Sequence, residues 1–188
     1  MCIRDSYTAF HSRNVAKIAE CLGKSLGLKR KKVMEIVNGA KLHDIGKMGI
    51  SPSILRKHGP LDEIEKEVIR NHPQHGKEVL QHFKYLERFV PYAYLHHERE
   101  DGSGYPQGLK GDEIPLEAKI LAVADVFEAL TADRPYRTAY SFAQAVDMMT
   151  EMSLDQDIVS KLISILPELE NELCGRNPRK CGIIGSQT

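Results

Sequence analysis

Hydrophobic residues recur every three or four positions along most of the chain, which is the spacing of helices that bury one face. The first such stretch covers residues 15–28, and the next covers residues 33–42 and continues into the sequence LHDIGK. Gly27 ends the first stretch, and Gly46 and Gly49 follow the second as stop signals. We therefore expect two amphipathic helices, with the histidine and aspartate of LHDIGK near a helix end.

The middle of the chain contains shorter helical patterns separated by loops. Residues 51–62 contain Pro and Gly and indicate a loop, followed by short helices over residues 63–72 and after Pro73. Another helix is expected over residues 85–97. Residues 98–115 then lack periodicity, and an irregular stretch of this length inside a compact domain usually has a function.

Helical periodicity returns after this loop and continues to residue 169. Pro115 opens a long apolar helix, and two further amphipathic stretches cover residues 141–152 and 157–169. No stretch alternates convincingly as a strand, and no internal repeat is present. We therefore predict an all-α fold built as one domain, which 188 residues with 41% hydrophobic composition can support.

Acidic and basic side chains balance, with 26 of each. Binding to a nucleic-acid duplex or to an anionic membrane requires a dominant basic surface. The balance argues against both classes of partner, so the partner is expected to be small or locally bound.

The sequence also favours a cytoplasmic protein without a membrane span. The four cysteines lack the spacing of a metal finger and are interpreted as reduced thiols. The most apolar stretch, residues 114–130, carries four charged side chains and is not expected to cross a membrane. The first residues, MCIRDSYTAF, lack the apolar segment of a secretory signal.

Asp125 lies in the apolar helix after Pro115, where its carboxylate faces the expected core. An unpaired buried carboxylate is costly, so a cation is expected beside it. Arg134 or Lys119 would supply an ion pair, and a metal ion would supply the same kind of charge. Asp125 alone leaves the two alternatives open.

Histidines elsewhere in the chain favour the metal. Imidazole and carboxylate ligands suit first-row metals such as iron and manganese, and one carboxylate can bridge two ions. The number of candidates fits a dinuclear centre. The candidates are His11, the pair His43-Asp44, His72, the adjacent pair His96-His97, and Asp125.

Three further histidines need another interpretation. His75 follows His72 by three residues and is a rival ligand, because this spacing can place both side chains on one helical face. His58 and His82 lie in a loop and in a polar stretch, and both are interpreted as solvated side chains.

The candidates belong to an ordered set of motifs: His11, HDIGK (43–47), HP (72–73), HHE (96–98), DGSGYP (101–106), Asp125 and DRPYR (133–137). Over residues 5–168 this set resembles the HD-GYP subgroup of the HD superfamily of metal-dependent phosphohydrolases. The resemblance implies an all-α bacterial signalling enzyme. Its implied activity is a phosphodiesterase that hydrolyses cyclic di-GMP to pGpG and often onward to GMP.

The family pattern, transferred residue by residue, implies two divalent metal ions, with iron as the expected metal and manganese as its substitute. One ion would be held by His11, His43, Asp44 and Asp125. Asp44 would bridge to the second ion, which would be held by His72, His96 and His97.

The same pattern implies residues that act on the substrate. Asp44 and Lys47 are expected to be catalytic, and Lys47 is also expected to contact a substrate phosphate. The further substrate contacts would be Tyr105 of the GYP motif, Arg134 and Arg137 of DRPYR, and Asp5, which matches a family acid nearer to substrate than to metal.

Some positions depart from the family pattern. Tyr7 stands where members with three metals have a Glu, so two ions are expected, and Glu100 replaces an aromatic residue common before DGSGYP. Residues 1–6 look foreign and are expected to lie outside the domain, which would cover residues 7–168. Residues 169–188 are expected to form a loose tail.

The resemblance leaves other functions open. A catalytically silent relative would sense a cyclic dinucleotide or dock a partner, but such relatives lose ligand residues, and all dinuclear ligands are present here. A hydrolase of another cyclic dinucleotide, such as cyclic GMP-AMP, is a further alternative. The pattern is also compatible with a regulatory domain or partner outside this chain and with a homodimer.

Overall fold

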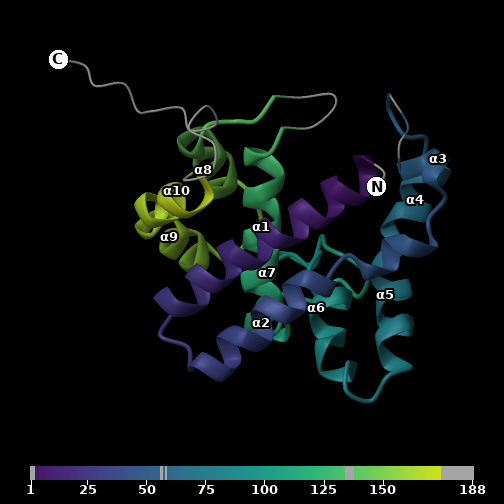
Figure 1. Cartoon of the computed structure of the whole chain (residues 1–188), viewed down its shortest axis with the longest axis horizontal. Helices are drawn as coiled ribbons and strands as arrows, with labels where there is room; N and C mark the ends of the chain where they lie inside the picture. The colour runs from purple at the N-terminus through teal and green to yellow at the C-terminus, as the bar shows by residue number, and fades with distance from the viewer. Residues whose placement is uncertain (1–2, 56, 58, 134–137, 175–188) are drawn as a thin grey trace.

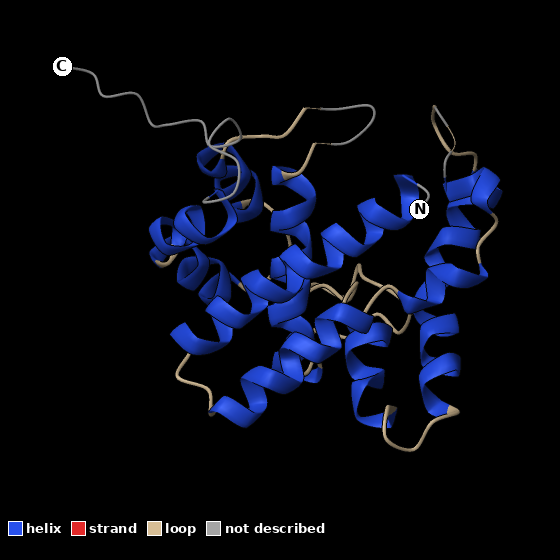
Figure 2. Ribbon diagram, viewed as in Figure 1, coloured by secondary structure: helices blue, strands red, loops and turns tan. Residues whose placement is uncertain are grey.

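The computed structural model describes residues 3–55, 57, 59–133 and 138–174, and every regular element in these ranges is helical (Figure 2). This confirms the predicted all-α fold. The elements are α1 (Ile3–Ser25), α2 (Arg30–Leu42), η1 (Ile45–Gly49), α3 (Pro52–Leu55), α4 (Glu63–Arg70), α5 (His72–Gln81), η2 (Glu87–Phe89), α6 (Val90–Leu95), η3 (Gly111–Glu113), α7 (Leu116–Thr131), α8 (Phe142–Thr150), α9 (Gln156–Ser164) and α10 (Leu166–Cys174).

Local sequence signals set the starts of two helices. Asp62 caps α4 by accepting a hydrogen bond from the Glu65 amide, and the Glu65 side chain accepts one in return from the Asp62 amide. Ser141 and Gln144 form the same reciprocal pair at α8. Each pair satisfies amides that the first turn of a helix leaves without a backbone partner, so the helices begin at these residues.

The core lies where α1 packs along α2 and crosses α7 (Figure 1). Helix α1 contributes Val15, Ile18 and Leu22, which are fully buried and spaced by three or four residues. Helix α7 is buried along most of its length because α8 and α9 pack on one side and α6 on the other. Each large apolar side chain buried here stabilises the fold by about 1.5–3 kcal/mol. The contact therefore fixes the helices that carry three of the candidate ligands.

Several helix boundaries differ from the predicted ones. Helix α1 begins at Ile3, well before the predicted start at residue 15. The sequence did not indicate this earlier start because residues 3–14 are mostly polar and show little apolar periodicity. The helix predicted over residues 85–97 is divided into η2 and α6, and Pro91 at the start of α6 cannot donate the hydrogen bond that would join them. The stretch predicted over residues 157–169 is likewise two helices, α9 and α10.

Both ends of the helical domain extend beyond the predicted limits. Residues 3–6 form part of α1, so the helix starts before the boundary expected at residue 7. At the other end, α10 buries Leu169 completely in the core and continues to Cys174. Packing of Leu169 in the core, with Leu173 partly buried against it, explains why helical structure passes residue 168.

The most apolar helix is too short to span a bilayer. Helix α7 has 16 residues, whereas a transmembrane helix needs about 20. Among the described residues, no helix combines the length and apolar character that crossing a membrane requires.

Candidate metal centre

All seven predicted metal ligands gather where five α-helices and the short 3₁₀ helix η1 meet. Packing of α1 against α2 and α7, and of α5 against η1 and α6, brings them together. In chain order they are His11 on α1, His43 and Asp44 at the junction of α2 and η1, His72 at the start of α5, His96 and His97 after α6, and Asp125 on α7.

The close approach of η1 to α5 depends on Gly46. A Cβ at this position would lie 1.9 Å from the His72 carbonyl oxygen, far inside van der Waals contact. Only glycine allows the two segments to pack at this distance. The glycine of HDIGK therefore places Asp44 beside His72.

Subsite 1 consists of His11, His43 and Asp125, whose candidate ligand atoms all lie within 4.8 Å of one another. The Asp125 Oδ1 atom is 3.3 Å from His11 Nε2 and 3.9 Å from His43 Nε2. Both histidines are buried, and the Asp125 side chain is 15% exposed. Two imidazoles and a carboxylate thus face one small space.

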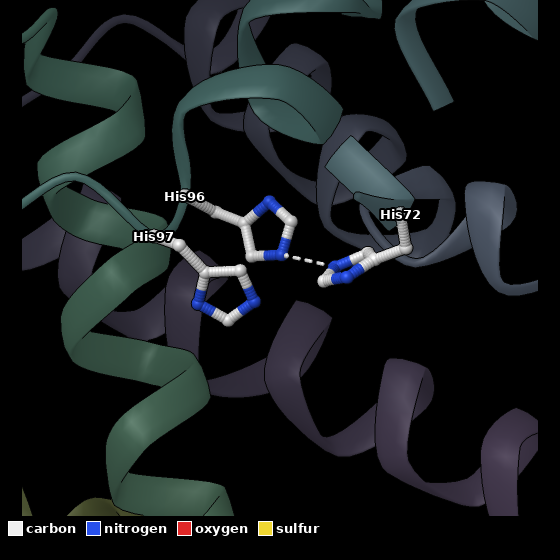
Figure 3. Close-up of side chains that lie close together, drawn as sticks. All are labelled: His72, His96 and His97. Atoms are coloured by element: carbon white, nitrogen blue, oxygen red, sulfur yellow. Dashed lines mark hydrogen bonds between the residues drawn. The ribbon is translucent and has the colours of Figure 1, made fainter. Parts of the chain in front are cut away.

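Subsite 2 consists of His72, His96 and His97, whose candidate ligand atoms also lie within 4.8 Å of one another. Figure 3 shows the three rings turned toward a common space, with His96 and His97 on one segment and His72 opposite. The Nε2 atoms of His72 and His96 are 3.3 Å apart. This subsite offers three imidazoles.

Asp44 joins the two subsites. Its Oδ2 atom faces subsite 1, at 3.6 Å from His11 Nε2 and 3.4 Å from His43 Nε2. Its Oδ1 atom faces subsite 2, at 3.4 Å from His72 Nε2. One carboxylate therefore presents an oxygen to each cluster, which is the arrangement of a bridging ligand.

Hydrogen bonds on Nδ1 fix the orientation of three of these rings. His43 Nδ1 is 2.6 Å from the Ala40 carbonyl oxygen, and His72 Nδ1 is 2.7 Å from the Ile69 carbonyl oxygen. His11 Nδ1 instead lies 2.5 Å from a carboxylate oxygen of Glu128. When Nδ1 carries the proton of a neutral imidazole, the lone pair of Nε2 is directed to the centre of the site.

The two subsites shift histidine pKa values in opposite directions. Burial lowers the pKa of His11, but hydrogen bonds to Asp125 and Glu128 outweigh it and raise this pKa to about 10. Burial lowers the pKa of His97 to about 3 and the pKa of His96 well below its usual value. The carboxylates of subsite 1 thus hold a positive charge, whereas the rings of subsite 2 are neutral at pH 7.

The carboxylates of the centre stay ionised despite their burial. Burial by itself raises the pKa of Asp44, but the charges of His43 and Lys47 outweigh it and hold this pKa well below its usual range. The pKa of Asp125 is lowered in the same way, against its burial, by the hydrogen bond and charge of His11 and by the charge of His43. The site therefore combines buried negative charge with nitrogen ligands.

The donor set fits two divalent ions. His43 Nε2 and Asp44 Oδ1 are buried without a hydrogen-bond partner, although both point toward the other candidate ligands. Buried polar atoms without partners are costly, and a cation between them would satisfy both. Mixed imidazole and carboxylate ligands match iron, manganese or zinc better than magnesium or calcium.

Two predicted substrate contacts lie beside the centre. Lys47 Nζ donates to Asp44 Oδ2 at 2.6 Å, and the side chain is one-third exposed. The Tyr105 ring stacks on His97 with centroids 4.7 Å apart. Burial raises the pKa of Tyr105 to about 12, so its hydroxyl keeps its proton near neutral pH.

The loop after His97 is built by residues that the sequence analysis did not single out. The Glu98 carboxylate is buried and accepts hydrogen bonds from the Gln107 and Leu109 amides. Arg99 donates to the Glu98 carbonyl oxygen at 2.8 Å. These bonds close the GYP loop and hold Tyr105 beside the centre. The HHE motif already contained Glu98, but its role depends on a loop conformation that the motif does not reveal.

Glu128 and Arg70 were also missed. Glu128 is 3% exposed, and its spacing of three residues from Asp125 on an apolar helix was the available signal. The Arg70 guanidinium lies over the Tyr105 ring at 5.0 Å. This contact joins the end of α4 to the GYP loop, and no sequence pattern indicates it.

Other expectations meet a different outcome. Lys119 pairs with Glu100 and Asp155, at 3.0 and 3.1 Å, so of the alternatives left open for Asp125 the ion pair with Lys119 is not the one formed. His75 belongs to none of the ligand groups in the described ranges, and its Nε2 is 3.4 Å from the Asn71 amide nitrogen. Three predicted residues, Arg134, Arg137 and His58, lie outside the residues that the structure describes. For Asp5 and Tyr7 the structure describes the backbone but not the side chains.

An all-α domain with a buried centre of histidines and aspartates, built around an adjacent His-Asp pair, has the architecture of the HD class of metal-dependent hydrolases. The comparison with protein families gives the same class. The family model described as HD domain matches residues 2–158, and the chain belongs to this family. The family resemblance drawn from the motifs is thus confirmed.

Curated relatives support this membership. The chain is 35% identical over 176 residues to 3'3'-cGAMP-specific phosphodiesterase 3 of Vibrio cholerae, covering 90% of this chain and 38% of that protein. It is 39% identical over 178 residues to the cyclic di-GMP phosphodiesterase response regulator RpfG of Xanthomonas campestris, covering 92% of this chain and 47% of that protein. The chain thus spans less than half the length of these relatives.

Solved structures share the fold. The Bdellovibrio bacteriovorus protein Bd1817, described as an HDG"Y"P protein, superposes with a TM-score of 0.69 at 20% identity, over 85% of this chain and 52% of that chain. The HD domain of the Listeria monocytogenes phosphodiesterase PgpH, solved in complex with cyclic-di-AMP, gives a TM-score of 0.63 at 19% identity, over 88% and 92%. These likenesses establish the helical architecture.

Proposed function

We propose that this domain is a metal-dependent phosphodiesterase that hydrolyses cyclic di-GMP to pGpG and onward to GMP. The observation that carries the proposal is Asp44, which presents one oxygen to each of two histidine clusters. A sensing module needs a binding surface but not a complete bridged ligand set. The names of several relatives, cyclic di-GMP phosphodiesterases, support the same reaction.

Two ions, iron or manganese in its place, are proposed to occupy the subsites. His11, His43 and Asp125 would hold one, His72, His96 and His97 would hold the other, and Asp44 would bridge them. A bound pair of divalent ions supplies a water with its pKa lowered from 15.7 toward about 7 and neutralises charge on phosphoryl oxygens.

The protein's own residues would orient the phosphodiester. Hydrolysis forms a bond from a water oxygen to phosphorus and breaks the bond to a ribose 3′ oxygen, which leaves with a proton. The Lys47 ammonium, partly exposed beside Asp44, would donate hydrogen bonds to a non-bridging phosphate oxygen. The Tyr105 hydroxyl would donate a second such bond from the opposite subsite. Arg134, Arg137 and Asp5 are proposed as further substrate contacts.

A second candidate substrate is the mixed cyclic dinucleotide 3'3'-cGAMP. Several relatives are named as phosphodiesterases specific for it, and their identities to this chain, 35–40%, overlap with the 38–40% of several cyclic di-GMP enzymes. Both dinucleotides contain the same kind of phosphodiester, so one centre can act on either. The choice between them depends on contacts to the bases.

The test is incubation of the protein, loaded without oxygen with Fe²⁺ or in parallel with Mn²⁺, with each dinucleotide, followed by chromatography of the products. We expect pGpG and then GMP from cyclic di-GMP. His75→Ala is the matched control, since it removes a histidine next to the centre but outside the ligand groups. Tight binding of cyclic di-GMP with no product in either metal would instead identify a silent sensing module.

A further inference from the structure

Among the oriented rings, His11 has a different kind of anchor. The Nδ1 atoms of His43 and His72 meet backbone carbonyl oxygens of their own helical segments, at Ala40 and Ile69. The Nδ1 atom of His11 meets the carboxylate of Glu128, which lies 117 residues away in sequence. A backbone carbonyl is neutral, whereas a carboxylate carries charge, so the three anchors are not equivalent.

The environment of Glu128 shows that this contact is built into the core. The residue is 3% exposed, and its second oxygen accepts a hydrogen bond from the Asn14 side chain at 3.3 Å. Asn14 and His11 are three residues apart on α1, and Glu128 and Asp125 are three residues apart on α7. His11 and Asn14 on α1 therefore face Asp125 and Glu128 on α7. The two carboxylates lie on either side of the His11 ring.

We propose that Glu128 is a positioning residue for a metal ion at His11, and that it makes subsite 1 the tighter of the two metal subsites. The inference rests on the proposed dinuclear centre. Glu128 holds the proton of His11 on Nδ1, which directs the Nε2 lone pair to subsite 1. Its negative charge increases the basicity of that nitrogen, as carboxylates behind metal-binding histidines do elsewhere.

The distribution of charge supports the difference between the subsites. Asp125 and Glu128 both contact His11 of subsite 1, whereas the ligand group of subsite 2 in the described residues consists of three imidazoles, with Asp44 beside His72 and the charge of Asp125 also acting on His97. Lys47 reduces the excess of negative charge at subsite 1, because its ammonium contacts the Asp44 oxygen that faces this subsite. Lys47 is a single partly exposed cation against two mostly buried carboxylates, so the attraction at subsite 1 is the larger effect.

The test is calorimetric titration of the metal-free full chain with Mn²⁺ alone, so that no substrate turnover enters the result. The wild type is expected to bind two equivalents in two steps. His72→Gln removes a ligand of subsite 2 and should abolish the weaker step, which assigns the stronger one to subsite 1. Glu128→Gln keeps the size of the side chain but removes its charge, and it should weaken the stronger step about 10- to 100-fold.

Two further variants separate positioning from simple stability. Glu128→Asp keeps the charge and should recover part of the affinity. Asn14→Ala removes the hydrogen bond from Asn14 to Glu128 and should leave both steps nearly unchanged. An unaltered first step in Glu128→Gln, or an equal loss in both steps, would overturn the inference while leaving the dinuclear centre in place. A wild type that binds no Mn²⁺ would overturn the proposed centre itself.

Discussion

The two halves of the centre use the same side chain in opposite electrostatic settings. In subsite 1, carboxylates on both sides of His11 raise its pKa to about 10. In subsite 2, burial outweighs the charges of Asp125 and Asp44 and lowers the pKa of His97 to about 3. The neighbours of a buried imidazole therefore decide whether it carries charge. In subsite 1 a metal ion would displace a proton from His11, whereas subsite 2 offers neutral rings that need not lose a proton to become ligands.

Removing Asp44, the residue that both subsites share, should weaken metal binding at both subsites at once. Asp44→Ala takes away the carboxylate whose oxygens face the two subsites. We expect loss of detectable hydrolysis and a lower metal content, measured by product chromatography and elemental analysis. Two retained equivalents of metal with near-normal turnover would refute the bridging role.

Removing one proposed ligand of subsite 2 should reduce metal binding at that subsite and leave subsite 1 occupied. The wild type purified without oxygen is expected to contain two metal equivalents, and His72→Gln is expected to contain one, because subsite 1 keeps all its ligands. Elemental analysis measures both. Three equivalents in the wild type, reduced to two by Tyr7→Phe, would show that Tyr7 acts as a ligand and that the prediction of two ions is wrong.

Lys47 tests the side of subsite 1 without removing a proposed metal ligand, since its ammonium contacts Asp44 but leaves it in place. Lys47→Ala should keep both metals and lose roughly ten- to a hundredfold in kcat/KM, since a hydrogen bond to a charged group typically contributes about 1.5–3 kcal/mol. Arg137→Ala is expected to behave similarly. The control for loss of a positive charge is Lys66→Ala, which replaces an exposed lysine on α4. A metal-free Lys47→Ala protein would place this lysine in the structural support of the centre instead.

Tyr105 tests the side of subsite 2 and should give the smallest effect. Tyr105→Phe keeps the ring that stacks on His97 and lies under Arg70, and it removes only the hydroxyl. We expect a loss of about tenfold in kcat/KM, at the low end of the roughly 1.5–3 kcal/mol for a hydrogen bond to a charged group, because the donor is neutral. Because the pKa of Tyr105 is about 12, the ratio between wild type and variant should stay constant from pH 7 to pH 9. A ratio that changes across this range would contradict a protonated hydroxyl.

The pattern of the sequence was sufficient for the fold class and for a list of candidate ligands that the structure brings together. Helical periodicity is a local property, so it appeared in the residues of α2 and α7 before any contact was known. It failed where the local signal was weak or interrupted, as in the polar first half of α1 and at Pro91. The ligands were visible because a buried carboxylate and adjacent histidines are costly without a partner.

The sequence by itself determined that this protein is all-α, that it belongs with the HD-type hydrolases, and that seven residues were candidates for two metals. Tertiary structure alone decided how those residues are oriented and supported. The anchor of His11 comes from Glu128, 117 residues away, and the ring of Tyr105 is covered by Arg70 from another helix. The spacing of Glu128 from Asp125 indicated only a shared helix face, and no pattern indicated Arg70, because each contact depends on the angle at which two helices or a helix and a loop pack. Local sequence therefore specified the ligands, and long-range packing specified the electrostatic difference between the two subsites.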